Sequence, residues 1–365
     1  MTDMPTAAAA PETSGTQLAQ TLQQIVPVDE TAREASETRQ LDLTKPPGSL
    51  GRLETLGNQL SAIAGSCPPP VPEPALLCIF AGDHGVHAQG VSPWPQEVTI
   101  QMVANMLNGG AGGNVLARTV GADVAVIDVA TMAPLDDPRL VNRHLAFGTA
   151  DLSRGPAMTR EQAVAALEVG IDMARTAVAD GYRVLLPGEV GIGNTTAAAA
   201  LIAVFTGRPA AEVTGSGAGA YGDALVAKAA LIARAIEERG VTADDPVAAL
   251  AEVGGFEHAA IAGLLLGAAA ERVPVILDGV IACASALVAV ALCPAVRGYL
   301  IAGHLGAEPG IAAAASVLEL TPVVGLDMRL GEGTGAALAL PIVQASARVL
   351  REMATFSSAG VSGSE

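Results

Sequence analysis

Residues 188–196 (GEVGIGNTT) combine three glycines with Glu189 and end in Asn194 and two threonines, at the start of an alanine-rich helical pattern. A helix N-terminus offers unpaired N–H groups and the positive end of the helix dipole, which favour a phosphate or a ribose ligand. An ordinary Asn or Thr helix cap is the alternative, but a cap needs neither three glycines nor a glutamate. The segment therefore predicts a binding loop, in which Glu189 would accept hydrogen bonds from ribose hydroxyls or face a cationic transition state.

Glu332 lies between Gly331 and Gly333 at a predicted strand-to-helix turn. Flanking glycines let the backbone bring this carboxylate close to a ligand. Such a group can act as a general base, with its pKa adjusted by burial and by Glu189. The alternative is a first-turn glutamate that only complements the helix dipole. The glycines on both sides favour the catalytic interpretation.

Two further glycine patterns resemble dinucleotide-binding fingerprints. Residues 217–222 fit G-x-G-x-x-G and residues 331–336 fit G-x-G-x-x-A. Both are weak signals, because the first follows no clear strand and the second has no following strand–helix–strand unit. Lys228 lies nine residues after Gly219 and could reach a phosphate as a point charge. A solvated helical lysine is the equal alternative, although Lys45 and Lys228 are the only lysines in the chain.

Short apolar runs alternate with helical patterns along most of the chain, which predicts a parallel sheet covered by helices on both faces. The predicted strands are 75–80, 123–129, 183–186, 273–277, 298–302 and 322–326, and the predicted helices are about 95–120, 159–179, 194–206, 223–239, 257–271, 280–292, 309–318 and 334–354. Five of these strands run into loops that combine glycine with an acidic residue. Because parallel strands end at one edge of a sheet, we expect these loops to form one site there.

Composition excludes several classes of partner. The chain has 365 residues, 20 basic and 37 acidic side chains, a net charge of −17 and 2% aromatic residues. Such a chain repels phosphate backbones and anionic lipids and offers few aromatic rings for base stacking. We therefore expect no nucleic-acid and no membrane partner. Residues 273–296 are apolar but contain Asp278, a glycine and two prolines, which favours strand, turn and buried helix over a membrane span.

The four cysteines lie apart in mostly apolar stretches, which indicates reduced thiols and a cytoplasmic location. The five histidines do not form an H-x-x-x-H pattern, and His84 beside Asp83 is the best ligand-like pair among them. We therefore expect neither a metal site nor a cofactor.

The chain resembles the nicotinate-nucleotide:dimethylbenzimidazole phosphoribosyltransferase family of cobalamin biosynthesis. The resemblance covers about residues 40–360, and its most specific stretches are 45–54 (KPPGSLGRLE), 81–86 (AGDHGV), 90–92 with 98–103, 188–196, 278–279 and 329–337 (RLGEGTGAA). It implies a Rossmann-like parallel α/β sheet with a small helical domain built from the chain ends, and a homodimer. It also implies small-molecule substrates, with phosphoribose moving from nicotinate mononucleotide to 5,6-dimethylbenzimidazole.

The resemblance also implies roles for individual residues. Glu332 matches the catalytic base and Glu189 supports it. The positions that match the phosphoribosyl-binding loops are Gly191, Gly193, Asn194, Gly215, Gly217, Lys228, Asp278 and Gly279, and those that fall in the base-binding segments are Ser92, Gln101 and Leu330. Lys45 receives no chemical role.

Residues 216, 220–222 and 303–311 depart from the family pattern, which leaves other functions open. One is a paralogue that uses another base, and another is a non-catalytic nucleotide-binding regulator. An NAD-dependent oxidoreductase is a third, which rests only on the weak glycine patterns.

The expected organisation is a disordered tail at 1–16, an N-terminal helical part of the small domain at 17–70 and a large α/β domain at 71–330. The catalytic loop and C-terminal helix follow at 331–356 and join the small domain, and a flexible tail occupies 357–365.

Overall fold

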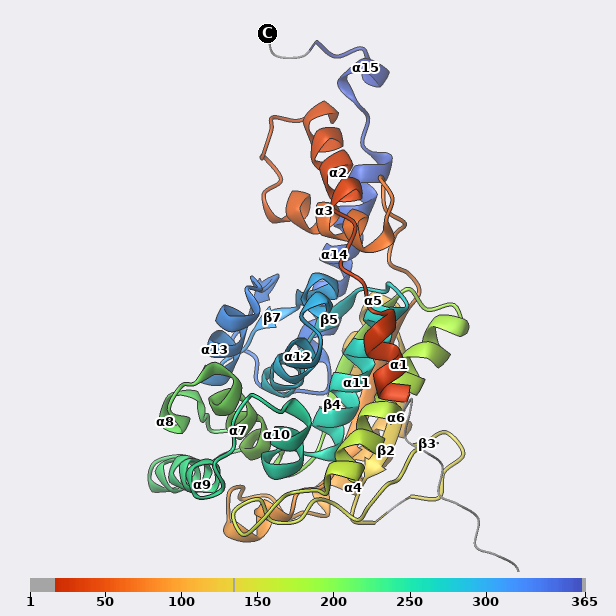
Figure 1. Ribbon diagram of the computed structural model, residues 1–365. Coiled ribbons are helices and arrows are strands. Elements are labelled where there is room, and N and C mark those ends of the chain that lie inside the picture. Colours follow the sequence, from red (N-terminus) through yellow and green to blue (C-terminus); the bar gives the residue numbers. More distant parts are fainter. Residues whose placement is uncertain (1–16, 134, 363–365) are drawn as a thin grey trace, which may run out of the picture.

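The computed structural model describes residues 17–133 and 135–362; the expected tail at 1–16 and the last three residues of the other tail lie outside this range. A six-stranded parallel sheet forms the centre of the molecule (Figure 1). In spatial order its strands are β3 (Val141–Asn142), β2 (Asp123–Ala130), β1 (Ala75–Gly82), β4 (Val184–Val190), β5 (Val275–Leu277) and β6 (Leu300–Ala302). Successive strands are added toward one edge up to β3 and toward the other edge from β4 onward, which confirms the doubly wound architecture.

The two faces of the sheet bury two separate apolar cores, because neighbouring side chains on a strand point to opposite faces. On β1, Leu76, Cys78 and Phe80 belong to one core, whereas Leu77 and Ile79 belong to the other. The larger core packs against α1 (Gln17–Gln24), α6 (Arg160–Ala179), α7 (Asn194–Thr206), α10 (Pro246–Val253), α11 (Phe256–Ala270), α12 (Val280–Leu292) and α13 (Pro309–Leu318).

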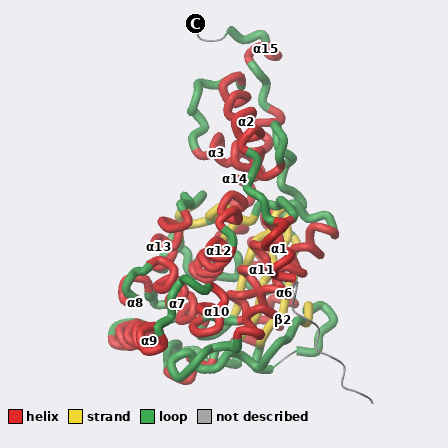
Figure 2. Tube along the Cα trace, viewed as in Figure 1, coloured by secondary structure: helices red, strands yellow, loops and turns green. Residues whose placement is uncertain are grey.

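The second core packs against α3 (Arg52–Ala64), α4 (Val98–Leu107), α5 (Gly112–Val120) and α14 (Thr334–Glu352). The sheet thus lies between two helical layers (Figure 2). Helix α9 (Asp223–Arg239) also contributes Leu231, Ile232 and Ala235 to the larger core. The remaining elements are short: η1 (Gly85–Gln89), α8 (Ala210–Val213), η2 (Pro294–Tyr299), α15 (Phe356–Ala359), and the strand pair β7 (His304–Leu305) and β8 (Val324–Gly325).

Two predicted elements differ from the structure. The helix expected over 95–120 is two helices, α4 and α5, because Gly109, with φ of 75°, and Gly110 lie between them. The strand expected at 322–326 shortens to β8, which pairs with β7 instead of joining the main sheet, since a short apolar strand can pair at the edge of either sheet. Its preceding residue still bonds to the end of β6, because the N–H of Val323 donates to the carbonyl of Ala302. The segment 273–296 forms β5 and α12 as predicted.

A small lobe of helices projects from the sheet domain (Figure 1). It contains α2 (Glu30–Asp42), α3 and the C-terminal part of α14, whereas α1 packs on α6 and α11 of the large domain. The expected 17–70 unit is therefore divided between the two parts. In this lobe the buried Lys45 ammonium lies 2.7 Å from Glu54 Oε1, which also accepts the N–H of Leu50. This ion pair closes the loop between α2 and α3.

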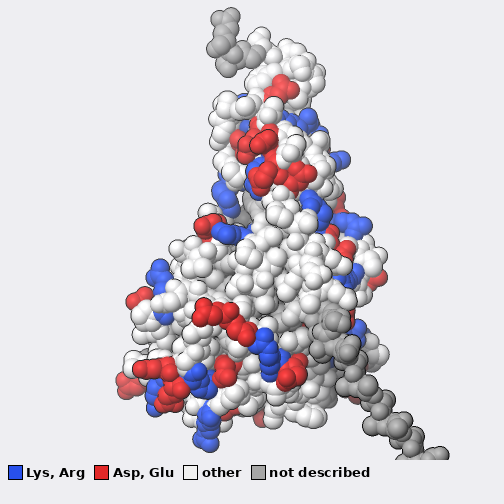
Figure 3. All heavy atoms as spheres, in the orientation of Figure 1, with Lys and Arg blue, Asp and Glu red and all other residues white. Residues whose placement is uncertain are grey.

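On the face drawn in Figure 3, charged side chains gather over the small lobe and over the helices at the opposite end of the molecule. The band between them carries few charges. Within the described ranges, no helix combines the length and the apolar character needed to cross a membrane.

Helices α6 and α11 approach each other closely because glycines form the contact. A Cβ added to Gly170 of α6 would lie 1.8 Å from the carbonyl oxygen of Ala260, and one added to Gly263 of α11 would lie 1.9 Å from that of Leu167. Neither carbonyl can move without disturbing its helix. The contact therefore depends on the absence of these side chains.

We predict that Gly170→Ala lowers the free energy of unfolding by about 2 kcal/mol, because overpacking a core contact typically costs this much. Urea unfolding monitored by circular dichroism measures the change. The matched control is Gly155→Ala, at a position where an added Cβ meets nothing within 4 Å. Equal midpoints for the two variants would contradict the packing argument.

Candidate active site

The carboxyl-end edge of the sheet carries a cavity of about 290 Å³. It lies outside β4, next to the point where the order of strand addition reverses, as expected for an open parallel sheet. Its lining comes from the loops after β4, β5, β6 and β8, from the loop before α9 and from the segment before α4. It includes Trp94, Glu189, Gly191, Asn194, Thr195, Gly217, Gly279, His304, Glu308, Arg329, Leu330 and Glu332. The predicted convergence of four of the five glycine-and-acid loops is thus observed, while the loop after β1 does not line the cavity.

Glu332 sits at a strained turn on the wall of this cavity. Its φ is 60°, in the left-handed region, and its side chain is buried. The Oε2 atom accepts the N–H of Gly113 at the start of α5, at 2.9 Å. Burial raises the pKa of Glu332, the hydrogen bond from Gly113 opposes this rise, and the nearby charge of Asp278 adds to it. A raised pKa makes this carboxylate a stronger base than an ordinary glutamate.

Two glycines allow the Glu332 backbone to lie where it does. A Cβ on Gly188 of β4 would come within 2.9 Å of the Glu332 carbonyl carbon, and a Cβ on Gly113 would come within 2.5 Å of its carbonyl oxygen. Any side chain at either position would push the glutamate out of place. The backbone of Glu332 therefore packs directly against the backbone of two other segments.

Asp278 binds the backbone of the same turn and does not line the cavity. Its carboxylate accepts the N–H groups of Gly333, Gly335 and Ala336 at 3.1, 2.7 and 3.3 Å. His304, which does line the cavity, places its Nε2 atom 3.6 Å from the same carboxylate. Asp278 was predicted as a ligand-binding residue, and its contacts in the structure are those of a positioning residue.

Glu189 lies beside the same turn, since a Cβ added to Gly331 would be 2.3 Å from its Oε1. Its other oxygen accepts a hydrogen bond from the Asn194 side chain. Burial raises its pKa to about 8, and the charges of Asp278, Glu257 and Glu332 add to the rise. Asn194 opposes the shift. Glu189 is therefore largely protonated at neutral pH, so it can donate a hydrogen bond to a ligand as well as accept one.

Lys228 is buried behind the cavity wall. Its ammonium donates to Thr195 Oγ1 at 2.9 Å and to the carbonyl of Gly215 at 3.3 Å. Burial lowers its pKa to about 8, against the opposing attraction of Glu308. Glu308 in turn accepts the N–H of Gly217 at 2.8 Å. Lys228 and Glu308 thus hold the 215–219 loop against the start of α7 from two sides.

The comparisons with known proteins agree with this geometry. A family model described as phosphoribosyltransferase matches residues 25–361. This chain belongs to that phosphoribosyltransferase family. A nicotinate-nucleotide–dimethylbenzimidazole phosphoribosyltransferase of Salinispora tropica is 51% identical over 94% of this chain and 99% of its own length. One of Chloroflexus aggregans, with the same name, is 52% identical over 94% of this chain and 98% of its own length.

A crystal structure of the nicotinate-nucleotide–dimethylbenzimidazole phosphoribosyltransferase of Thermus thermophilus shares the fold. It superposes with a TM-score of 0.87 at 44% sequence identity, covering 92% of this chain and all of the other. The resemblance described from the sequence is thereby confirmed, and the fold of this phosphoribosyltransferase is that of a solved relative.

The predicted site residues of this phosphoribosyltransferase divide into two layers. Seven line the cavity, namely Glu189, Gly191, Asn194, Gly217, Gly279, Leu330 and Glu332. Gly193, Gly215, Lys228 and Asp278 lie behind that lining, where they shape or hold the loops. Ser92 and Gln101 are not brought to the cavity; the Ser92 hydroxyl accepts the N–H of Trp94, whose indole reaches the wall, and Gln101 is exposed on α4.

Sequence reasoning missed Glu308, His304, Arg329 and Trp94 as lining residues. Glu308 and His304 had a usable signal, because they lie in the glycine-and-acid loop after β6. Trp94 had another, as the single tryptophan of the chain. For Gly112 and Gly113, the only signal in the sequence was the GGAGG stretch at 109–113, which breaks a helical pattern.

We predict that Glu189→Gln changes how stability depends on pH. The pKa of Glu189 is about 8 in the folded protein, against an ordinary 4.5. Between these values the folded protein keeps a proton that the unfolded chain has released, so the Glu189 contribution to stability is present below pH 4.5 and is lost as the pH rises to about 8. The variant should lose less stability than wild type over this range.

Urea unfolding at about pH 5 and about pH 9 measures the difference. Glu212→Gln, an exposed glutamate on α8, is the control and should follow wild type. The same pH dependence in Glu189→Gln and wild type would contradict the shifted pKa.

Proposed function

We propose that this chain transfers the 5-phosphoribosyl group from nicotinate mononucleotide to 5,6-dimethylbenzimidazole, giving α-ribazole 5′-phosphate and nicotinate. The names of the relatives support the two substrates. The single structural observation that carries the proposal is Glu332, a carboxylate with a raised pKa that is fixed at the wall of the one cavity where the glycine-and-acid loops meet within the described residues.

The proposed reaction balances without a metal or a redox cofactor. One benzimidazole nitrogen forms a bond to C1′ of the sugar, while the bond from C1′ to the pyridinium nitrogen breaks and its electron pair returns to nicotinate. The other benzimidazole nitrogen gives its proton to Glu332. In the transition state between these bonding arrangements, positive charge develops on the sugar, and the Glu332 carboxylate stabilises this charge.

We place the phosphoribosyl group against the start of α7. Gly191, Asn194 and Gly217 supply the cavity wall there, Gly279 faces it from the loop after β5, and Lys228 provides a positive charge from behind Thr195. Glu189 then faces the ribose.

The base would lie toward the cavity rim, where Leu330 and Trp94 line the wall although 61% and 53% of their surfaces are exposed. Such exposed apolar surface favours covering by a flat aromatic base or by another chain. We therefore keep Leu330 as a proposed base-binding residue, whereas Ser92 and Gln101, which do not line the cavity, rest on the resemblance alone. We also propose the homodimer that the resemblance implies and the cytoplasmic location that the cysteines indicate. Light scattering in solution separates a dimer from a monomer.

We predict that wild type forms α-ribazole 5′-phosphate from the two substrates and that Glu332→Gln lowers kcat by about 100-fold or more, because general-base catalysis contributes this much. Glutamine keeps an oxygen that can accept the Gly113 N–H, so the turn should survive. Chromatography of the products measures the rate, and Glu212→Gln is the control.

The outcomes separate the parts of the proposal. Tight binding of nicotinate mononucleotide without any product would favour a non-catalytic binding protein. Product with another base but none with dimethylbenzimidazole would favour a paralogue. Full turnover by Glu332→Gln would refute the base assignment alone.

We also predict that Lys228→Met lowers kcat/KM for nicotinate mononucleotide about 10- to 100-fold, because the positive charge behind Thr195 that would attract the phosphate is lost. Nicotinate riboside lacks the phosphate, so its slow turnover should not change. The control Arg234→Met removes an exposed cation from the same helix. An equal loss with both substrates would indicate that Lys228 only holds the loop.

A further inference from the structure

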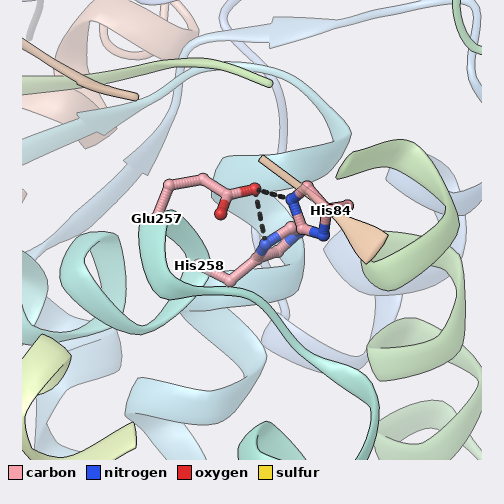
Figure 4. Close-up of side chains that lie close together, drawn as sticks. All are labelled: His84, Glu257 and His258. Atoms are coloured by element: carbon pink, nitrogen blue, oxygen red, sulfur yellow. Dashed lines mark hydrogen bonds and ion pairs between the residues drawn. The ribbon is translucent and has the colours of Figure 1, made fainter. Parts of the chain in front are cut away.

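A second cluster of titratable side chains lies outside the cavity (Figure 4). It consists of His84, just after β1, and Glu257 and His258, in the first turn of α11, all with no exposed surface. Both imidazoles point toward Glu257 Oε1, with His84 Nε2 at 2.6 Å and His258 Nδ1 at 3.0 Å. The three residues are separated by more than 170 positions in sequence at their widest, so sequence spacing alone gave no sign of the cluster.

Hydrogen bonding does not account for this cluster. His84 Nε2 and Glu257 Oε1 are well aligned, but His258 Nδ1, although near Oε1, is not oriented to bond with it. Among the described residues, Glu257 Oε2, His84 Nδ1 and both ring nitrogens of His258 have no hydrogen-bond partner. A buried polar atom without a partner is costly, and a bound ion is one of the ordinary explanations for it.

We propose that His84, Glu257 and His258 bind a divalent transition-metal ion of the Zn²⁺ type. Their ligand atoms all lie within 4.8 Å of one another. Two imidazole nitrogens and one Glu257 carboxylate oxygen would give three ligands, and a water molecule would complete the four that zinc takes. Imidazole with carboxylate is also a donor set that such ions prefer. The ion would use Glu257 Oε2 and His258 Nδ1, which have no hydrogen-bond partner.

Glycines approach the cluster closely, at positions where a side chain would clash with the ligand residues. A Cβ on Gly255 would lie 2.8 Å from Glu257 Oε2 and 3.0 Å from His258 Nδ1, and a Cβ on Gly82 would lie 2.9 Å from the same Oε2. On the other side, His84 packs beneath Gly193, whose added Cβ would be 3.2 Å from His84 Cβ.

The proposed ion is structural, because none of the three ligands lines the cavity. It would join the end of β1 to the start of α11 under the loop that leads into α7. It goes beyond the proposed function, which needs no metal, and it revises the expectation drawn from the sequence that the chain has no metal site.

The test uses the full-length protein without a histidine tag. We expect mass spectrometry of the purified protein to find a transition metal at about one equivalent per chain. After removal of the metal with a chelator, titration with Co²⁺ should produce the visible absorption of imidazole-bound cobalt, and Zn²⁺ should abolish it. Metal-loaded protein should also unfold at a higher temperature than the metal-free form.

His258→Gln should abolish the cobalt absorption. The matched control is His144→Gln, because His144 also faces a buried carboxylate, with Nδ1 3.3 Å from Asp128 Oδ2, but belongs to no such cluster. Wild-type protein that holds no metal and gives no cobalt absorption would overturn the proposal, whatever the variants do. Equal cobalt absorption in wild type and His258→Gln would also overturn it. Turnover measurements test the proposed function separately.

Discussion

The bonds from the Asp278 carboxylate to the backbone of the 331–336 turn are the interaction on which the candidate active site depends. A glutamate with φ of 60° is strained by roughly 1–2 kcal/mol. Three N–H groups donate to Asp278, and hydrogen bonds to a charged group are worth about 1.5–3 kcal/mol each. The carboxylate therefore outweighs the strain and holds Glu332 in the one conformation that aims it at the cavity.

This support has an electrostatic consequence. Asp278 is also one of the charges that raise the pKa values of Glu189 and Glu332. The same carboxylate thus positions the proposed base and strengthens it. Burial is the largest cause of both shifts, and the neighbouring carboxylates add to it, so that the pKa of Glu189 rises to about 8. A site with this excess of negative charge suits a reaction whose transition state is cationic at the sugar.

The sequence predicted the elements and site residues that have strong local patterns. The helices α6, α7 and α12 are recovered nearly to the residue, because apolar spacing and glycine punctuation determine them locally. Glu332 was also recognisable, since glycines on both sides of a glutamate have few other uses. Partnerships between distant residues left no such pattern, and nothing in the local sequence of Asp278 or Lys228 indicates that each bonds to a protein loop. Residue type and loop position predict that a residue belongs to the site, but only the packing distinguishes lining residues from those behind them.

Charged side chains around the cavity bond to its loops at glycines. Asp278 bonds to the backbone at Gly333 and Gly335, Glu308 to that at Gly217, and Lys228 to that at Gly215. A glycine lets a buried charge approach the backbone of a cavity loop without a side chain between them, where the low dielectric strengthens the interaction. Glycine in these loops therefore does more than permit turns. It also lets charged side chains approach closely enough to bond to the loop backbone and hold the cavity-lining residues in place. The start of α7 and the nearby Lys228 ammonium supply the positive potential that the proposed phosphate needs, so the net charge of −17 affects that place only weakly.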